Sequence, residues 1–171
     1  MRRLSFLKPL LLAAGAALLT ACASTTPPPN GAARDDVLRA WGQPTGRYSL
    51  PGGVERLEYA TGPYGRTTWM VDVDSGGRIV QSQQVLSEAG FLRMQSAQAG
   101  PGLRREGLLQ MLGRPGERRG GGRQGGEVWS YRYPTNDCLW FQVSVLDNGS
   151  VGSSGYFVDP TCDAPSGDGH S

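Results

Sequence analysis

Few side chains in this sequence have the type and spacing that catalysis or metal binding needs. The 171-residue chain has a single histidine, His170, next to its last residue. A hydrolase needs a nucleophile beside a positioned base, and a zinc site needs closely spaced histidine, cysteine or carboxylate ligands. His170 lies in a stretch rich in Ser, Gly and Asp, residues 164–171, which we expect to be a disordered tail. We therefore predict that the chain is not an enzyme and binds no metal or cofactor.

One segment carries the carboxylates of a calcium loop but not its complete pattern. Asp72, Asp74 and a glycine at the sixth position match, whereas Gln83 stands where a bidentate glutamate belongs. The residues from Asp74 to Gly77 suit a tight turn between two strands. A hairpin is therefore the better interpretation.

The N-terminus has the pattern of an export signal. Three basic residues within the first eight precede an apolar run over residues 9–19, which is too short to span a bilayer comfortably. The following Leu-Thr-Ala-Cys, which ends at Cys22, resembles the lipobox of bacterial lipoproteins, and the resemblance implies acylation by chains such as palmitate. We expect residues 1–21 to be the signal peptide; the alternative is an ordinary signal peptide that contains a cysteine. Ala23, in place of an aspartate, points to the outer membrane.

Residues 22–30 contain three consecutive prolines and are predicted to form a semi-rigid tether. Removal of the signal peptide leaves 17 − 3 = 14 basic against 15 acidic side chains, so that the mature chain is close to neutral. Bulk electrostatics therefore disfavour nucleic acid as a partner. Glycine and proline together exceed a fifth of the residues, which suits a turn-rich fold that contains strands.

Two cysteines remain, Cys138 and Cys162, and an even number is typical of disulfide bonding in the oxidising periplasm. A disulfide between them would close a loop of about 25 residues and stabilise the fold by about 3 kcal/mol. The alternative is two free buried thiols. We predict the disulfide.

An internal repeat organises the rest of the chain. Five positions recur with a constant offset: Gly31, Val37, Trp41, Gly42 and Pro44 in the first segment, and Gly102, Leu108, Leu112, Gly113 and Pro115 in the second. Each set predicts a short helix, because two apolar residues one turn apart share a face and a glycine followed by a proline ends the helix.

Alternating segments follow each predicted helix. In the first half they cover residues 54–59, 67–73 and 78–85, and in the second half residues 127–133, 139–145 and 155–158. Residues 87–94 suggest a further short helix. We therefore predict an α+β fold of two tandem αβββ repeats over residues 31–90 and 91–163, with helices packed on three-stranded antiparallel sheets that lie side by side or edge to edge.

The pattern Gly-x5-Val-x3-Leu-Gly-x-Pro, matched more closely from Gly102 to Pro115 and more loosely from Gly31 to Pro44, resembles the SmpA/OmlA (BamE-like) outer-membrane lipoproteins, together with the aromatic strands and the lipobox cysteine. The two-repeat arrangement also resembles the β-lactamase inhibitory proteins, which are secreted binders. The first resemblance implies a lipid-anchored protein on the periplasmic face of the outer membrane that supports the β-barrel assembly machinery or envelope integrity. The second implies an alternative, a binder or inhibitor of a soluble periplasmic enzyme.

Two sets of residues are candidates for contacts with partners. Aromatic side chains gather on the predicted strands, and an exposed patch of them would dock a protein partner. The candidates are Trp69, Trp129, Tyr131, Trp140 and Phe141. Trp140 and Phe141 are neighbours on one strand, so they cannot point the same way. A basic segment from Arg118 to Arg123 reads as a flexible loop, solvated or in contact with lipid phosphates.

Overall fold

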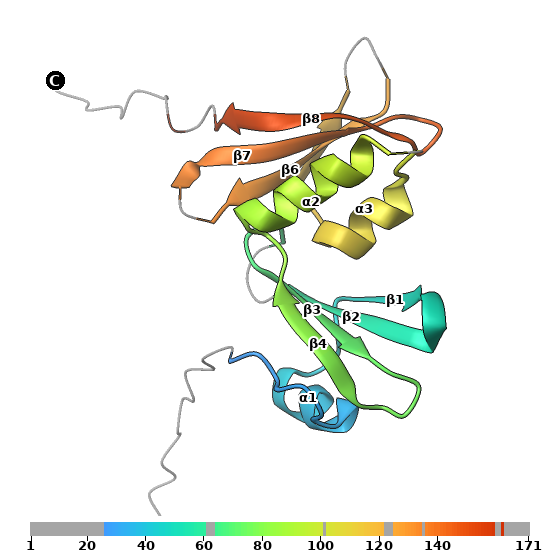
Figure 1. The fold of residues 1–171 in the computed structure, drawn as a ribbon. Helices are drawn as coiled ribbons and strands as arrows, with labels where there is room; N and C mark the ends of the chain where they lie inside the picture. The colour runs from blue at the N-terminus through green and yellow to red at the C-terminus, as the bar shows by residue number, and fades with distance from the viewer. Residues whose placement is uncertain are drawn as a thin grey trace, which may run out of the picture.

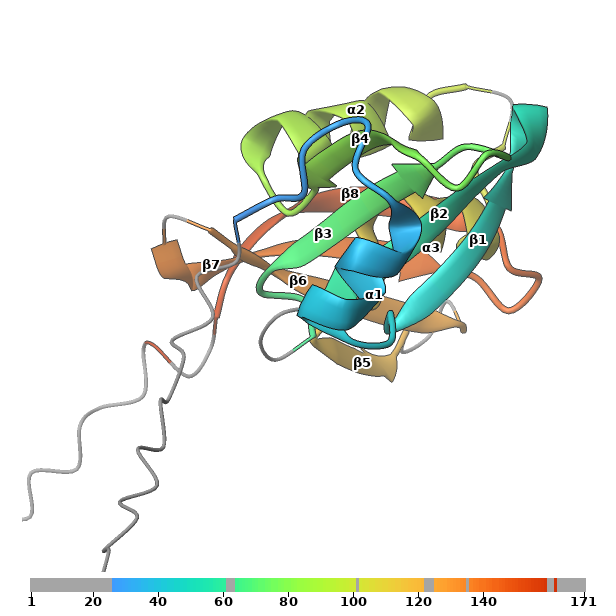
Figure 2. The same cartoon turned by 90° about the horizontal axis from the view of Figure 1, so that it is seen from below.

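The computed structural model describes residues 26–60, 64–100, 102–121, 125–134 and 136–159, together with Cys162. Over these residues the fold is α+β, as predicted, with two four-stranded antiparallel sheets and three α-helices (Figure 1 and Figure 2). The predicted signal peptide, the acylation at Cys22, and His170 with the rest of the predicted tail lie outside the described residues. Among the helices described, none combines the length and the apolar character of a membrane span.

The first sheet has one more strand than the sequence predicts. Its strands pair in the order β1-β2-β3-β4. Their bounds are β1 Gly46–Leu50, β2 Val54–Ala60, β3 Thr68–Val73 and β4 Ile79–Gln84. The unpredicted strand β1 forms a hairpin with β2 through the 3-10 turn η1, Pro51–Gly53, in which Gly52 has a φ of 78°. Only glycine adopts this φ readily, so the Pro-Gly-Gly sequence was the signal of the missed hairpin.

The second sheet repeats the arrangement, with strands in the order β5-β6-β7-β8. Their bounds are β5 Glu117–Gly120, β6 Glu127–Tyr133, β7 Asn136–Val145 and β8 Val151–Val158. The prediction of a flexible loop from Arg118 to Arg123 is wrong in its first part, because Arg118 and Arg119 lie in β5 and pair with β6. The guanidinium of Arg118 lies 4.2 Å from the centroid of the Trp129 ring. Arg123 lies outside the described residues.

The two helices of the predicted repeat end in the same way. They are α1, Arg34–Trp41, and α3, Arg105–Leu112, and α2, Glu88–Gln98, lies between the halves. Gly42 follows α1 with a φ of 77°, and Gly113 follows α3 with a φ of 73°. Each glycine N–H donates to a carbonyl in the last turn of its helix, which closes the helix end.

Tyrosines at matching positions of β2 and β6 fasten these helix ends to their sheets. The hydroxyl of Tyr59 donates to the carbonyl of Gly42 at 3.2 Å, and the hydroxyl of Tyr131 donates to the carbonyl of Gly113 at 3.0 Å. Isolated bridges precede the two helices as well, Ala33 with Arg78 and Arg104 with Ser150. The same backbone pattern therefore occurs once in each half.

The molecule is built in four layers: α1, the first sheet, the α2 and α3 pair, and the second sheet (Figure 1). One core lies between α1 and the first sheet, and includes Val37, Leu57 and Val71. The larger core joins Met70 of β3 to Phe91 of α2 and to the residues of α3 and of the second sheet. The expectation that the sheets lie side by side or edge to edge is thus wrong. Strand β3 is buried on both faces, so its sheet needs a cover on each side.

The proline segment is packed against the fold and is not a free spacer over its described part. The carbonyl of Pro28 accepts a hydrogen bond from Ser82 Oγ at 3.0 Å, and the N–H of Gly31 donates to the carbonyl of Ile79 at 2.7 Å. Pro27, Pro28 and Pro29 form one wall of an apolar groove whose other wall is α1, with Val37 and Trp41. The N-terminal segment therefore reaches the fold at the α1 layer.

Candidate interaction surface

The structure separates the five predicted docking aromatics into two groups. Trp129, Tyr131 and Phe141 are fully buried in the larger core, so their prediction as docking residues is wrong. They point inward because α2 and α3 cover that face of the second sheet, which makes it the apolar side. Trp69 is partly buried against the smaller core, with its ring centroid 6.1 Å from that of Trp41. Trp140 lies on the other face from its neighbour Phe141, as the alternation predicts.

The face of the second sheet that is turned away from α2 and α3 is called the outer face here. Alternation along the strands places on it Glu117 and Arg119 of β5, Ser130 and Arg132 of β6, Trp140 and Gln142 of β7, and Phe157 of β8. Among the described helices, none lies over this face (Figure 1).

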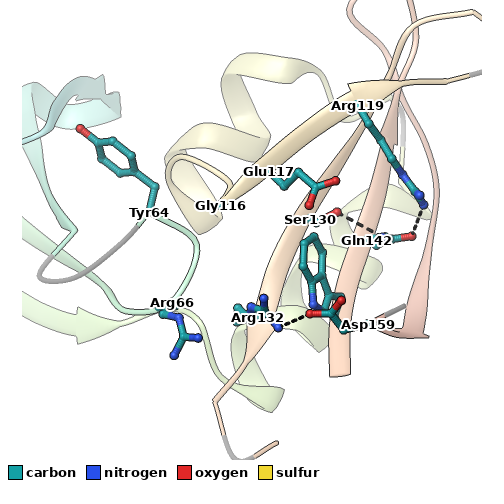
Figure 3. A pocket seen from close by; sticks show the side chains of 10 residues that line it. Tyr64, Arg66, Gly116, Glu117, Arg119, Ser130, Arg132, Gln142 and Asp159 are labelled. Carbon is teal, nitrogen blue, oxygen red and sulfur yellow. Dashed lines mark hydrogen bonds and ion pairs between the residues drawn. The ribbon is translucent and has the colours of Figure 1, made fainter. Parts of the chain in front are cut away.

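A concavity of about 480 Å³ opens on the outer face. Its floor is the sheet, and one wall is formed by Tyr64 and Arg66 from the segment between β2 and β3 (Figure 3). This wall is held in place by the carbonyl of Gly65, which accepts from the N–H of Arg132 at 2.7 Å. The first half of the chain therefore supplies one side of a concavity in the second half.

Arg132 is fixed at one end of the concavity. Its Nη1 donates to Oδ2 of Asp159 at 2.5 Å, and Asp159 is only 2% exposed. The guanidinium also lies 4.6 Å from the centroid of the Trp140 ring. A charge-assisted hydrogen bond and a cation–π contact in a partly buried setting both restrict the side chain. Arg132 and Trp140 thus form a rigid pair.

A second chain of hydrogen bonds crosses the strands beside this pair. Nη2 of Arg119 donates to Oε1 of Gln142 at 3.1 Å, and Nε2 of Gln142 donates to Oγ of Ser130 at 3.1 Å (Figure 3). Arg119 and Gln142 also line a neighbouring hollow of about 270 Å³ that extends to Phe157. The two hollows therefore form one continuous, preorganised surface.

The chemistry of this surface suits contact with a polypeptide. Arginine and tryptophan are the side chains that most often dominate binding at protein interfaces, and here they are held in place before binding. The three arginines that line the larger hollow, Arg66, Arg119 and Arg132, are opposed by Glu117 and Asp159. Among the described residues, no group of three or more histidine, cysteine or carboxylate side chains is placed to hold a metal ion.

The sequence prediction identified Trp140 but not its partners. Alternation places Arg132 and Gln142 on one face of their strands, and this signal was in the sequence. The pairing of Arg132 with Asp159 depends on residues 27 positions apart and on the strand register, which the sequence does not show.

The two cysteines of the predicted disulfide lie together in the structure. Cys138, in β7, and Cys162 are bonded, with their Cα atoms 5.7 Å apart. The bond ties the chain that follows β8 to β7, next to Asp159, whose N–H donates to the carbonyl of Cys138 at 2.7 Å. This end of the outer face is thereby fixed covalently.

The chain was compared with models of protein families, with curated proteins and with solved structures, and no match was found in any of the three.

Proposed function

We propose that this chain is a non-catalytic outer-membrane lipoprotein that acts as a protein-interaction module on the periplasmic side. Its role is accessory to the assembly of β-barrel outer-membrane proteins or to envelope integrity. The observation that carries the proposal is the uncovered outer face of the second sheet, where Trp140, Arg119 and Arg132 are held in place around a concavity. A rigid surface of this composition suits a docking role.

The proposal includes two BamE-like units, residues 31–90 and 91–163. The support is the backbone pattern that occurs in both halves: a helix ended by a glycine with positive φ, a tyrosine bonded to that glycine, and four antiparallel strands. The extra strand in each half extends the αβββ unit that the sequence predicts.

The packing of the proline segment limits how far the proposed anchor can lie from the fold. Cys22 precedes Thr26 by four residues, which span about 14 Å at most. Since Pro28 is bonded to β4, an acyl anchor on Cys22 lies close to the α1 layer. The outer face of the second sheet is at the opposite end of the four layers (Figure 1), and with an anchor beside α1 we expect it to be turned away from the membrane.

Site-specific photocrosslinking in intact cells tests the proposed partner. A photoreactive residue replaces Ser144, on the outer face, and a matched one replaces Val80, which is exposed on β4. The proposal expects adducts with barrel-assembly components from position 144 and not from position 80. Adducts with one soluble enzyme would favour the inhibitor alternative, and equal adducts from both positions would count against the outer face.

A second experiment tests the anchor separately. The variant Cys22→Ser should move the protein from the membrane fraction to the soluble periplasmic fraction, because the acyl chains attach through the thiol. Unchanged fractionation would contradict the lipoprotein assignment.

A further inference from the structure

Strand β8 differs from the other three strands at the sheet edges. Strand β1 carries Arg47, paired with Glu55, and β5 carries Arg118 and Arg119. Strand β4 is covered by the N-terminal segment through the bonds of Pro28 and Gly31. Strand β8 contains no charged residue and no proline. Proteins usually protect their sheet edges with such charges, prolines or covering segments, so an edge without them needs an explanation.

The register shows which backbone groups of β8 are free. The N–H of Asp159 donates to the carbonyl of Cys138, and antiparallel pairs alternate between bonded and non-bonded positions. Residues 157 and 155 therefore turn their backbone groups toward β7, whereas Tyr156 and Val158 turn theirs toward the free edge. In the described part of the chain, no hydrogen bond to these edge groups is seen.

The beginning of β8 is closed, and only its end is open. Nε2 of Gln98, in α2, donates to the carbonyl of Gly152, and Oγ of Ser154 donates to Oε1 of Gln98 at 2.6 Å. The same glutamine thus bonds the edge carbonyl of Gly152 and the side chain of Ser154. The open stretch runs from residue 155 to residue 158, about 13 Å of strand.

The open stretch carries three consecutive exposed apolar side chains. Tyr156, Phe157 and Val158 are 43%, 53% and 55% exposed. Phe157 pairs across the strands with Trp140, on the outer face. The Tyr156 ring lies on the opposite face, with its centroid 5.3 Å from that of Phe141. A strand added beside β8 would therefore find aromatic neighbours on both of its faces.

We propose that the open end of β8 binds an extended, uncharged, aromatic-rich segment of a partner polypeptide, which adds to the second sheet as a fifth strand. The free backbone donors and acceptors require an extended backbone, and the side chains of β8 offer no counter-charge. The open stretch is too short to bury the roughly 1,000 Å² that a stable pairing of two folded copies needs, whereas a short segment fits it. The inference extends the proposed interaction role to a second surface and does not depend on the lipid anchor.

Fluorescence anisotropy with the purified full-length chain in detergent tests this. The probe is a labelled eight-residue peptide in which Thr alternates with Tyr and Val. The control peptide has the same sequence with N-methyl groups at alternate residues, which removes the donors on one edge. We expect the probe to bind at least tenfold more tightly than the control, because strand addition depends on backbone hydrogen bonds.

Two variants locate the binding. Val158→Lys adds a charge at the open edge, and Val158→Pro removes an N–H that faces the edge and leaves the bonds to β7 intact. Both should weaken binding of the probe at least tenfold, and Val80→Lys on β4 should not. Far-UV circular dichroism and Tm check that each variant is folded.

Equal binding of the two peptides, or unchanged binding by both Val158 variants, would overturn the inference. So would a concentration-dependent dimer of the wild-type chain that Val158→Lys abolishes, since a second copy would then be the occupant. These outcomes are independent of the crosslinks from position 144, so failure of this inference and failure of the proposed function are distinguishable.

Discussion

The carboxylate of Glu58, in β2, accepts a hydrogen bond from the backbone N–H of Arg114, the second residue after α3, at 3.2 Å. Glu58 is fully buried and also accepts from the hydroxyls of Tyr48 and Thr45. Beside it, Nη1 of Arg56 donates to the carbonyl of Gln110, in α3, at 2.9 Å. These polar contacts connect the first sheet to the second half of the chain and fix how the two halves are stacked.

Replacement of Glu58 by Gln should lower the free energy of unfolding by about 1.5–3 kcal/mol. The amide NH2 cannot accept, so at least one of the three donors, from Thr45, Tyr48 and Arg114, loses its partner on this buried side chain, and hydrogen bonds to charged groups are the stronger ones. Denaturant unfolding measures the change. The control is Glu55→Gln, on the same strand, whose half-exposed ion pairs with Arg34 and Arg47 should contribute less than about 1 kcal/mol. Equal losses in the two variants would contradict the assigned role of Glu58.

The glycines that end α1 and α3 give a matched pair of variants. Gly42→Ala and Gly113→Ala both place a side chain at a positive φ, which costs about 1–3 kcal/mol. At Gly113 the new Cβ would also lie 2.8 Å from Cγ2 of Thr68 and 3.1 Å from Cδ of Glu58, whereas at Gly42 it meets nothing within 4 Å. Gly113→Ala should therefore be more destabilising by a further 1–3 kcal/mol or so. Thermal and denaturant unfolding of both variants measure the two losses of stability. Equal losses would contradict the close contact of Gly113 with Thr68 and Glu58.

Stability should fall as the pH rises above about 10, the ordinary pKa of tyrosine. Burial raises the pKa of Tyr131 well above that value, so the unfolded chain loses the hydroxyl proton before the folded chain does. The stabilising contribution is fully present below pH 10 and is lost as the pH increases toward the folded-state pKa. Tyr131→Phe should flatten this dependence, at a cost of about 1 kcal/mol at neutral pH for the hydrogen bond to Gly113. Unfolding curves between pH 8 and 11 give the slopes for the wild type and for Tyr131→Phe, and equal slopes would contradict the assigned role of Tyr131.

Reduction of the bond between Cys138 and Cys162, or its removal in Cys138→Ser, should destabilise the chain by about 3 kcal/mol through the loop that it closes. Unfolding with and without reductant measures the difference. Thiol titration of the denatured, unreduced protein should detect neither of these two cysteines. A reaction with both would show that the bond does not form.

Much of the fold was predictable because its signals are local. The apolar spacing of Val37 with Trp41, and of Leu108 with Leu112, predicts the two repeat helices, and the alternation of the later segments predicts six of the eight strands that the structure describes. Strands β1 and β5 were missed for a physical reason. They are short edge strands whose side chains are largely exposed or half-buried, so they lack a clear apolar alternation, and pairing with β2 and β6 is what holds them.

The sequence by itself determined the repeat, the alternation that puts Trp140 and Phe141 on opposite faces, and the cysteine pair, because these follow from chain geometry and composition. Only the tertiary structure decided which face of each sheet is covered. Glu58 alternates with Leu57 and Tyr59 and would face water in an isolated unit, but α3 packs over that side and buries it. The same stacking places Trp129 and Tyr131 under α2 and α3 and leaves Trp140 on the uncovered side. Which face of a sheet is covered depends on how the two halves pack on each other, and no local sequence pattern specifies it.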